Sequence, residues 1–163
     1  MRAERTREFC FEAHVPEPLG RVFALHEDPE HLVLLHRQGT AVRMLHHDGH
    51  VRVGAETWIE FNLGGLVPVV MGFWHIVYDP PRRFGERMIH GPFACFVHIH
   101  EFEVAGEGTT VRDRLQVAVP WQYGGDWALR WLMGPLLSRV FVRRGRALRQ
   151  FAVGGGFKQR GGQ

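Results

Sequence analysis

Two histidines spaced two residues apart, His98 and His100, are the residues of this chain best suited to chemistry. Side chains at i and i+2 of a strand share one face, so a strand through this segment presents both imidazoles together. If Gly106-Glu107 forms a two-residue turn, the following strand places Asp113 directly opposite His100. The carboxylate would then fix the tautomer of the imidazole, which could hold or deprotonate a ligand oxygen.

The same pair also has a purely structural interpretation. A buried carboxylate must find a partner, so His100 and Asp113 would simply order the sheet by binding one another. A slip of one residue in register would separate them and remove both interpretations.

A metal site is a further alternative, because a His-x-His pair on a strand suits metal ligation. The carboxylate is the difficulty: Glu103 falls on the opposite face of the strand, and Glu107 lies in the turn. Only His75 or His90 remains to approach across the sheet. We therefore expect no metal and no other cofactor. The histidines around the Asp48-Gly49 turn, which are His46, His47 and His50, are expected in solvent.

The elements around these residues are predicted to be mostly strands. Alternating apolar and polar side chains predict strands over residues 8–15, 40–46, 55–63, 69–78, 84–90, 93–104 and 109–119. Short connections make neighbouring strands antiparallel, because parallel neighbours need long crossovers. Two short helices, 18–26 and 29–36, are expected after the first strand.

A long amphipathic helix is predicted after Pro120, with Asp126 as its N-cap and its end near Phe151. Proline lacks an amide hydrogen, so a kink or break is expected near Gly134-Pro135. A curved sheet with one apolar face needs a cover, and this helix is the large apolar element left to provide it. The expected class is α+β, a curved antiparallel sheet of about seven strands wrapped around this helix with a ligand cavity between them.

Length and composition predict one domain, and the expected elements lie within residues 8–151. The chain has 163 residues, of which 45% are hydrophobic and 23% charged, as in ordinary globular proteins. The net charge of +3 is too small and scattered to predict nucleic-acid binding. Cys10 and Cys95 form no disulfide framework or metal motif. No signal peptide or membrane-spanning segment is visible, so we expect a cytoplasmic protein, with homo-oligomerisation left open. The glycine-rich residues 152–163 are predicted to be a disordered tail.

A series of short motifs runs along the chain in a fixed order. It comprises Trp74, Asp79-Pro80-Pro81, Phe84, Gly91-Pro92-Phe93, His98-x-His100-x-Phe102, Thr109-Thr110, Asp113, Pro120, Pro135-Leu136 and Phe141-x-x-Arg144. With the order of elements, this series resembles the START-like helix-grip (SRPBCC) superfamily, in its polyketide cyclase/dehydrase-like branch, over roughly residues 8–151. The resemblance implies an internal cavity for a hydrophobic small molecule or lipid, in a family that includes non-catalytic carriers and cyclases.

We therefore predict a protein that binds a hydrophobic small molecule or lipid between the sheet and the last helix. The residues expected to contact this ligand are His98, His100, Phe96, Phe102, Phe73, Trp74, Trp127 and Trp131. Glu86 is a further candidate polar group, and the arginines of the last helix are expected on a solvated face.

Two alternatives stay open. The first is a cyclase or dehydratase in which His100 is the general base, Asp113 orients it and His98 is a second polar contact. The second is an interaction module whose interior is filled by its own side chains.

Overall fold

The computed structural model describes residues 5–28, 31, 42–63 and 67–153. Its strands are β1 (Arg7–Val15), β2 (Val42–His47), β3 (Glu56–Leu63), β4 (Val67–Asp79), β5 (Arg83–His90), β6 (Cys95–Ala105) and β7 (Gly108–Ala118). Its helical segments are α1 (Leu19–Glu27), a 3-10 turn at Trp121–Tyr123, α3 (Gly125–Ala128), a π-helical turn at Leu129–Met133 and α4 (Gly134–Val153). Each expected strand is present, with bounds that differ by a few residues. The second short helix expected, 29–36, lies almost entirely outside the described residues.

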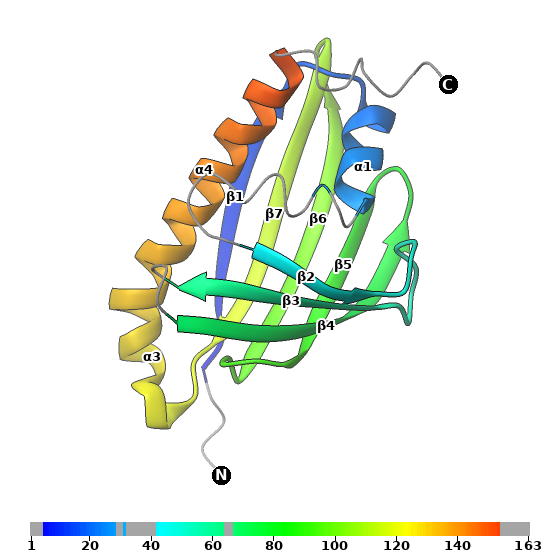
Figure 1. Ribbon diagram of the computed structural model, residues 1–163. Coiled ribbons are helices and arrows are strands. Elements are labelled where there is room, and N and C mark those ends of the chain that lie inside the picture. Colours follow the sequence, from blue (N-terminus) through cyan, green and yellow to red (C-terminus); the bar gives the residue numbers. More distant parts are fainter. Residues whose placement is uncertain (1–4, 29–30, 32–41, 64–66, 154–163) are drawn as a thin grey trace.

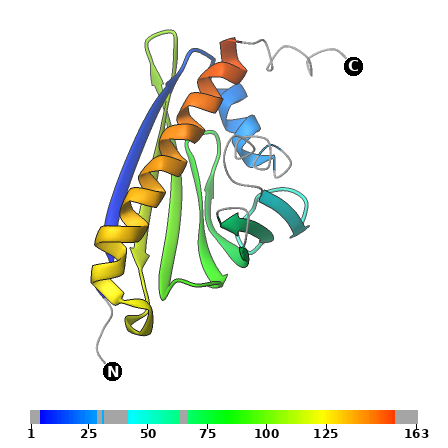
Figure 2. The ribbon, with the colours of Figure 1, turned by 60° about the vertical axis from the view of Figure 1, so that its left-hand side comes forward.

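The seven strands form one sheet in the order β1-β7-β6-β5-β4-β3-β2, and all neighbours are antiparallel. Figures 1 and 2 show that the sheet curves and that α4 lies along its β1 edge. Bulges in the β2–β3 and β4–β5 pairs contribute to this curvature, because an extra residue bends and twists a strand. The predicted α+β class with a curved sheet and a long C-terminal helix is confirmed.

The register of the β6–β7 hairpin is the one predicted from parity. Ala105 pairs with Gly108 across the Gly106-Glu107 turn, and His100 pairs with Asp113. Gly106 has a φ of 60°, the left-handed backbone that such a turn requires and that glycine adopts without steric cost. The tight turn therefore fixes which side chains meet farther along the hairpin.

The last helix is interrupted where the proline predicted it. A proline ring at position 135 would clash with the carbonyl of residue 131 in a regular α-helix, and the wider π-helical turn at 129–133 avoids this. The prediction that Asp126 is the N-cap is wrong. Gly124, with a φ of 96°, occupies that position, and both oxygens of Asp126 instead accept hydrogen bonds from Arg7.

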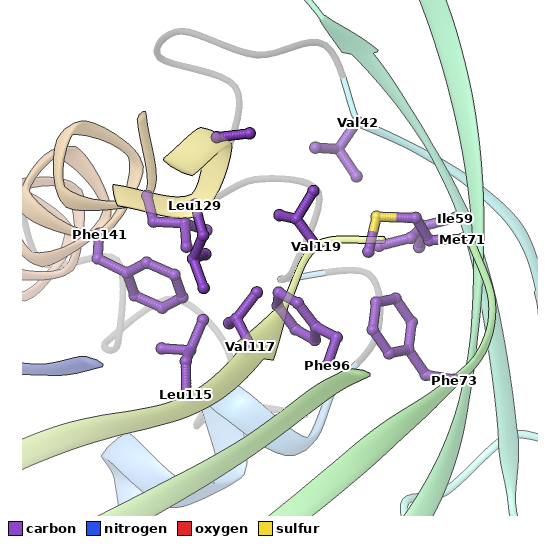
Figure 3. Packing of buried hydrophobic residues seen from close by; sticks show 12 residues of the cluster. Val42, Ile59, Met71, Phe73, Phe96, Leu115, Val117, Val119, Leu129 and Phe141 are labelled. Atoms are coloured by element: carbon purple, nitrogen blue, oxygen red, sulfur yellow. The ribbon is translucent and has the colours of Figure 1, made fainter. Parts of the chain in front are cut away.

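Apolar side chains on the inner face of the sheet form two separate clusters. One contains Phe96, Leu115 and Phe141 with residues of α3 and the N-terminal half of α4 (Figure 3). The other joins α1 to the C-terminal half of α4, around Phe102 and Leu148. The helix is held to the sheet at both ends by burial of apolar surface. No helix within the described ranges is long and apolar enough to cross a membrane.

Candidate functional site

A band of polar side chains separates the two apolar clusters. We call it the polar belt, and it consists of His26 (α1), His75 (β4), Glu86 (β5), His98 and His100 (β6), Asp113 (β7) and Arg144 (α4). On each of β6, β7 and α4, the belt residues lie between an apolar residue of the first cluster and an apolar residue of the second. On β6, for example, His98 and His100 lie between Phe96 and Phe102. Charged groups in the middle of a core are expensive unless they are paired, so their placement needs a reason.

Strand pairing aligns the belt across the sheet. His75 lies opposite Glu86, Glu86 lies opposite His98, and His100 lies opposite Asp113. Directly opposed residues on one face are close enough for their side chains to touch. The belt is therefore built by register.

Asp113 is the centre of this network. Its Oδ1 lies 2.6 Å from Arg144 Nη1, 3.0 Å from His98 Nε2 and 2.8 Å from His100 Nδ1. All four side chains are buried. Burial by itself would raise the pKa of the Asp113 carboxyl, but Arg144 and the two imidazoles hold it well below its usual range. Asp113 is thus an anion inside the core.

The tautomer of His100 follows from these distances. A carboxylate oxygen 2.8 Å from Nδ1 requires a proton on that nitrogen, because two lone pairs would repel. Arg144 Nη2 also approaches Nδ1, but at the longer distance of 3.4 Å. The shorter contact decides, so Nδ1 carries the proton and Nε2 offers a lone pair or a second proton to its surroundings.

Glu86 lies on the far side of the same two imidazoles. Its Oε1 is 3.5 Å from His98 Nδ1 and 3.9 Å from His100 Nε2, and its Oε2 is 3.7 Å from His75 Nδ1. Burial would raise the pKa of Glu86, but the contacts with His100 and His98 hold it well below the usual value. Burial would lower the pKa of His98, but Asp113 and Glu86 together outweigh it and raise that pKa. The buried carboxylates of Asp113 and Glu86 are therefore held between the guanidinium of Arg144 and the imidazoles of His98 and His100.

Three buried nitrogens of the belt have no hydrogen-bond partner within the described residues: His26 Nε2, His75 Nδ1 and Arg144 Nε. His26 Nδ1 lies 2.7 Å from the carbonyl oxygen of Val22 and must donate to it, so Nε2 of the neutral ring is a bare acceptor. Burial, then Arg144 and His100, hold the pKa of His26 well below its ordinary value, and burial lowers the pKa of His75.

A close approach of β5 to β6 brings Glu86 to the histidines. A Cβ at Gly85 would lie 2.8 Å from the carbonyl oxygen of His98 and 2.3 Å from a methyl group of Ile99. Only glycine fits there without moving the backbone. Beside it, the ring of Phe84 stacks on His100 with centroids 4.4 Å apart, which fixes the plane of that imidazole.

The predicted site residues divide into two groups. His98, His100, Phe73, Phe96 and Phe102 are buried on the inner face of the sheet. The three tryptophans that were also expected to contact a ligand are not buried there, since their exposed fractions are 43% for Trp74, 63% for Trp127 and 61% for Trp131.

Local geometry explains the three exposed tryptophans. Trp74 alternates with the buried Phe73 and His75, so its side chain points to the outer face of β4. Trp127 and Trp131 are four residues apart and share a helix face, which is exposed. The buried residues of this segment are Ala128 and Leu129, which lie on another face.

Sequence reasoning missed the role of Arg144. The sequence did indicate that Arg144 is buried, because it lies three residues after Phe141 and four before Leu148, on the apolar face of α4. It also missed His26, which shares a face of α1 with the buried Val22. Glu86, named only as a candidate polar group, is central to the site.

Three residues of the belt lie close enough together to be candidate metal ligands. Glu86, His98 and His100 place one ligand atom each within 4.8 Å of one another. The carboxylate is that of Glu86 on the neighbouring strand β5, and not that of Glu103, which faces the other side of β6.

Comparison with known proteins identifies the fold. No protein-family model and no curated protein sequence matches the chain. Solved structures do match: TTHA0849 from Thermus thermophilus has 22% identity and a TM-score of 0.69, covering 91% of this chain and 99% of that one.

Two further solved structures have the same fold. Ara h 8.0201 has 11% identity and a TM-score of 0.70, and the match covers 92% of this chain and 99% of that one. Major latex-like protein 151 from Panax ginseng has 13% identity and a TM-score of 0.69, and the match covers 91% of this chain and 98% of that one. These likenesses, all under 25% identity, show a shared helix-grip fold, while membership of the START-like superfamily and of its cyclase/dehydrase-like branch stays a prediction.

Proposed function

We propose that the protein binds an amphiphilic small molecule on the inner face of the sheet beneath α4, with the polar belt contacting the ligand's polar group. The observation that carries this proposal is the set of buried, unpartnered nitrogens that the belt has within the described residues. A buried polar atom without a hydrogen bond costs about 1–3 kcal/mol, and a ligand oxygen would recover that free energy.

The surroundings of the belt indicate the class of ligand. Apolar clusters on both sides favour a largely hydrophobic molecule, such as a lipid or a polyketide-like compound. Arg144 Nε is a donor that suits a carboxylate or an enolate oxygen, and His26 Nε2 is an acceptor that suits a hydroxyl group. The resemblance to the helix-grip family implies a ligand between sheet and helix, and a ligand bound there would lie against the belt.

The test uses cis-parinaric acid, a fluorescent fatty acid, with the purified full-length protein. Arg144→Lys retains a positive charge for Asp113 but removes the planar guanidinium and its Nε donor, so we expect at least tenfold weaker binding. The adjacent Arg143 is exposed, and Arg143→Lys is the matched control that should leave the affinity unchanged. The methyl ester of the probe should be far less sensitive to either substitution.

Two results would contradict the proposal. If both lysine variants, folded by near-UV circular dichroism, bind the acid as tightly as the parent protein, the belt does not contact the ligand. If the parent protein binds neither probe and native mass spectrometry shows no co-purified compound, the filled interaction module is the better interpretation.

A second candidate is acid–base catalysis of the cyclase or dehydratase type. The favouring observation is the contact of Asp113 Oδ1 with His100 Nδ1, which leaves Nε2 on the side of Glu86. A base in that position would remove a proton next to a ligand carbonyl. The assay is exchange of the α-hydrogens of 2-tetralone for deuterium in D2O. Enzyme catalysis predicts acceleration that His100→Gln abolishes, and a rate equal to that of buffer contradicts it.

A further inference from the structure

Three imidazole nitrogens converge on one carboxylate in the belt. They are His98 Nδ1 and His100 Nε2 on Glu86 Oε1, at 3.5 and 3.9 Å, and His75 Nδ1 on Glu86 Oε2, at 3.7 Å. These separations exceed those of good N–H···O hydrogen bonds, which are about 2.7–3.2 Å. Ligand atoms at about 2.0–2.2 Å from a tetrahedral Zn²⁺ lie roughly 3.3–3.6 Å from one another. The separations of Glu86 Oε1 from the two imidazole nitrogens are closer to those of two ligands of one ion, and the ligand atoms of Glu86, His98 and His100 all lie within 4.8 Å of one another.

The opposite edge of each imidazole is already anchored. His98 Nε2 and His100 Nδ1 both lie against Asp113 Oδ1, at 3.0 and 2.8 Å. Protons on those two nitrogens leave His98 Nδ1 and His100 Nε2 free to coordinate. A carboxylate behind a ligating histidine is the usual outer-shell arrangement of metal sites, where it fixes ring orientation and raises ligand basicity. Arg144, 2.6 Å from Asp113, keeps that carboxylate ionised.

His75 supplies a second, independent indication. The residue is 4% exposed, Nε2 lies 3.2 Å from Thr57 Oγ1, and Nδ1 faces Glu86 without a hydrogen-bond partner in the part of the chain described. A buried imidazole nitrogen directed at a candidate metal ligand either orients that ligand or joins it.

We propose that Glu86, His98 and His100 bind one divalent first-row transition-metal ion, with His75 adjoining the site and Asp113 and Arg144 forming its outer shell. Two imidazoles and a carboxylate suit Zn²⁺, Co²⁺ or Fe²⁺, whereas Mg²⁺ and Ca²⁺ prefer oxygen ligands alone. The site stands on the protein's own atoms and does not depend on the amphiphilic ligand. A coordination position left open by the three residues would face that ligand if both are present.

The competing account places a proton where the ion would be. In that account His98 is an imidazolium that bridges Glu86 and Asp113, and Glu86 contacts three histidines without an ion. The two accounts differ in a direct measurement, because only the first predicts stoichiometric metal binding.

The experiment titrates Co²⁺ into full-length protein that has been treated with a chelator and then freed of it. We expect one equivalent per chain to remain bound through gel filtration, with visible absorption bands of four- or five-coordinate Co²⁺. Zn²⁺ should displace it and remove the bands. Glu86→Gln, nearly equal in shape, should weaken Co²⁺ binding at least tenfold, and His100→Gln is the second variant should the first fail to fold.

The matched control is the exposed group His46, His47 and His50, because exposed histidines also bind metal ions weakly. Replacing all three by alanine should leave the single equivalent and its spectrum unchanged. Loss of binding in this triple variant, or binding in folded Glu86→Gln equal to that of the parent protein, overturns the proposal. Binding of cis-parinaric acid to the metal-free protein is measured separately, so failure of one proposal is distinguishable from failure of the other.

Discussion

The buried carboxylate of Asp113 contacts Arg144, His98 and His100. The carboxylate of Asp126 instead forms an ion pair with Arg7 near solvent. Removing the charge of Asp113 leaves the guanidinium of Arg144 buried without its anion. Asp113→Asn is therefore expected to reduce the free energy of unfolding by about 3–5 kcal/mol.

Urea unfolding measures this loss, and Asp126→Asn is the control. Solvent screens the exposed pair, so its loss should be far smaller. Equal effects of the two substitutions would show that the Asp113 network does not hold the core together.

The pH dependence of stability reports on His26. Its pKa in the folded protein lies well below the ordinary value of 6.5, so folding favours the neutral ring. This stability is fully present above pH 6.5 and is lost as pH falls below it, at up to about 1.4 kcal/mol per pH unit. His98 acts in the opposite direction, because its pKa in the folded protein is raised. Its contribution to the free energy of unfolding is therefore lost as the pH increases through that raised pKa.

His26→Asn retains a donor for the Val22 carbonyl but no longer titrates. We expect the fall in unfolding free energy between about pH 7 and pH 5 to be shallower in this variant, measured by urea unfolding with chelator present. His50→Asn, at an exposed position, should reproduce the parent slope. An unchanged slope in His26→Asn would mean that the ring is accessible to water in the folded state.

Residue pairs within the β6–β7 hairpin were predictable from the sequence. Side-chain contacts between elements that are not neighbours in the chain were not. Parity placed His98, His100 and Asp113 correctly, because strand geometry has a period of two. The position of Glu86 depends on a bulge between β4 and β5, which parity does not reveal. Arg144 was named only as part of the Phe141-x-x-Arg144 motif, and its ion pair with Asp113 joins two elements whose packing the residue types do not specify.

At the scale of elements, the contact between α4 and β1 positions the belt. A Cβ at Gly145 would lie 3.1 Å from the Cβ of Ala13, so the helix approaches the strand closely beside Arg144. Gly145→Leu should push α4 away, separate Arg144 from Asp113 and reduce the free energy of unfolding by about 1–3 kcal/mol.

The matched control is Gly20 of α1, where an added Cβ would meet nothing within 4 Å. Gly20→Ala should raise stability slightly, because alanine loses less backbone entropy in a helix. Thermal unfolding of both variants is the measurement. A Gly145→Leu protein as stable as the parent would show that the helix is not held closely to β1.

The order of elements was predictable, and the details of the last helix were not. Alternation located each strand, and the apolar spacing after Pro120 located the helix. The effect of Pro135 was expected, but a π-helical turn and Gly124 as N-cap depend on backbone geometry that residue types do not specify. The three tryptophans were misplaced because hydrophobicity alone does not state which face a side chain occupies.

On the scale of the whole molecule, the fold is shared with proteins under 25% identical, so the architecture does not set the ligand. The interior of this chain is divided by the polar belt into two apolar clusters. Stability alone favours well-packed apolar residues over buried ion pairs of similar volume. A belt that costs stability in this way is consistent with our two proposals, which assign it to a ligand and to an ion.

The most direct test of this account follows the ring nitrogens of the histidines by long-range ¹H–¹⁵N NMR while cis-parinaric acid is added. The account predicts that the signals of His26, His98 and His100 shift with the added probe and saturate together. The exposed His46, His47 and His50 serve as internal controls and should not move. If the probe binds while the belt signals stay fixed, the ligand lies elsewhere and the belt is only structural.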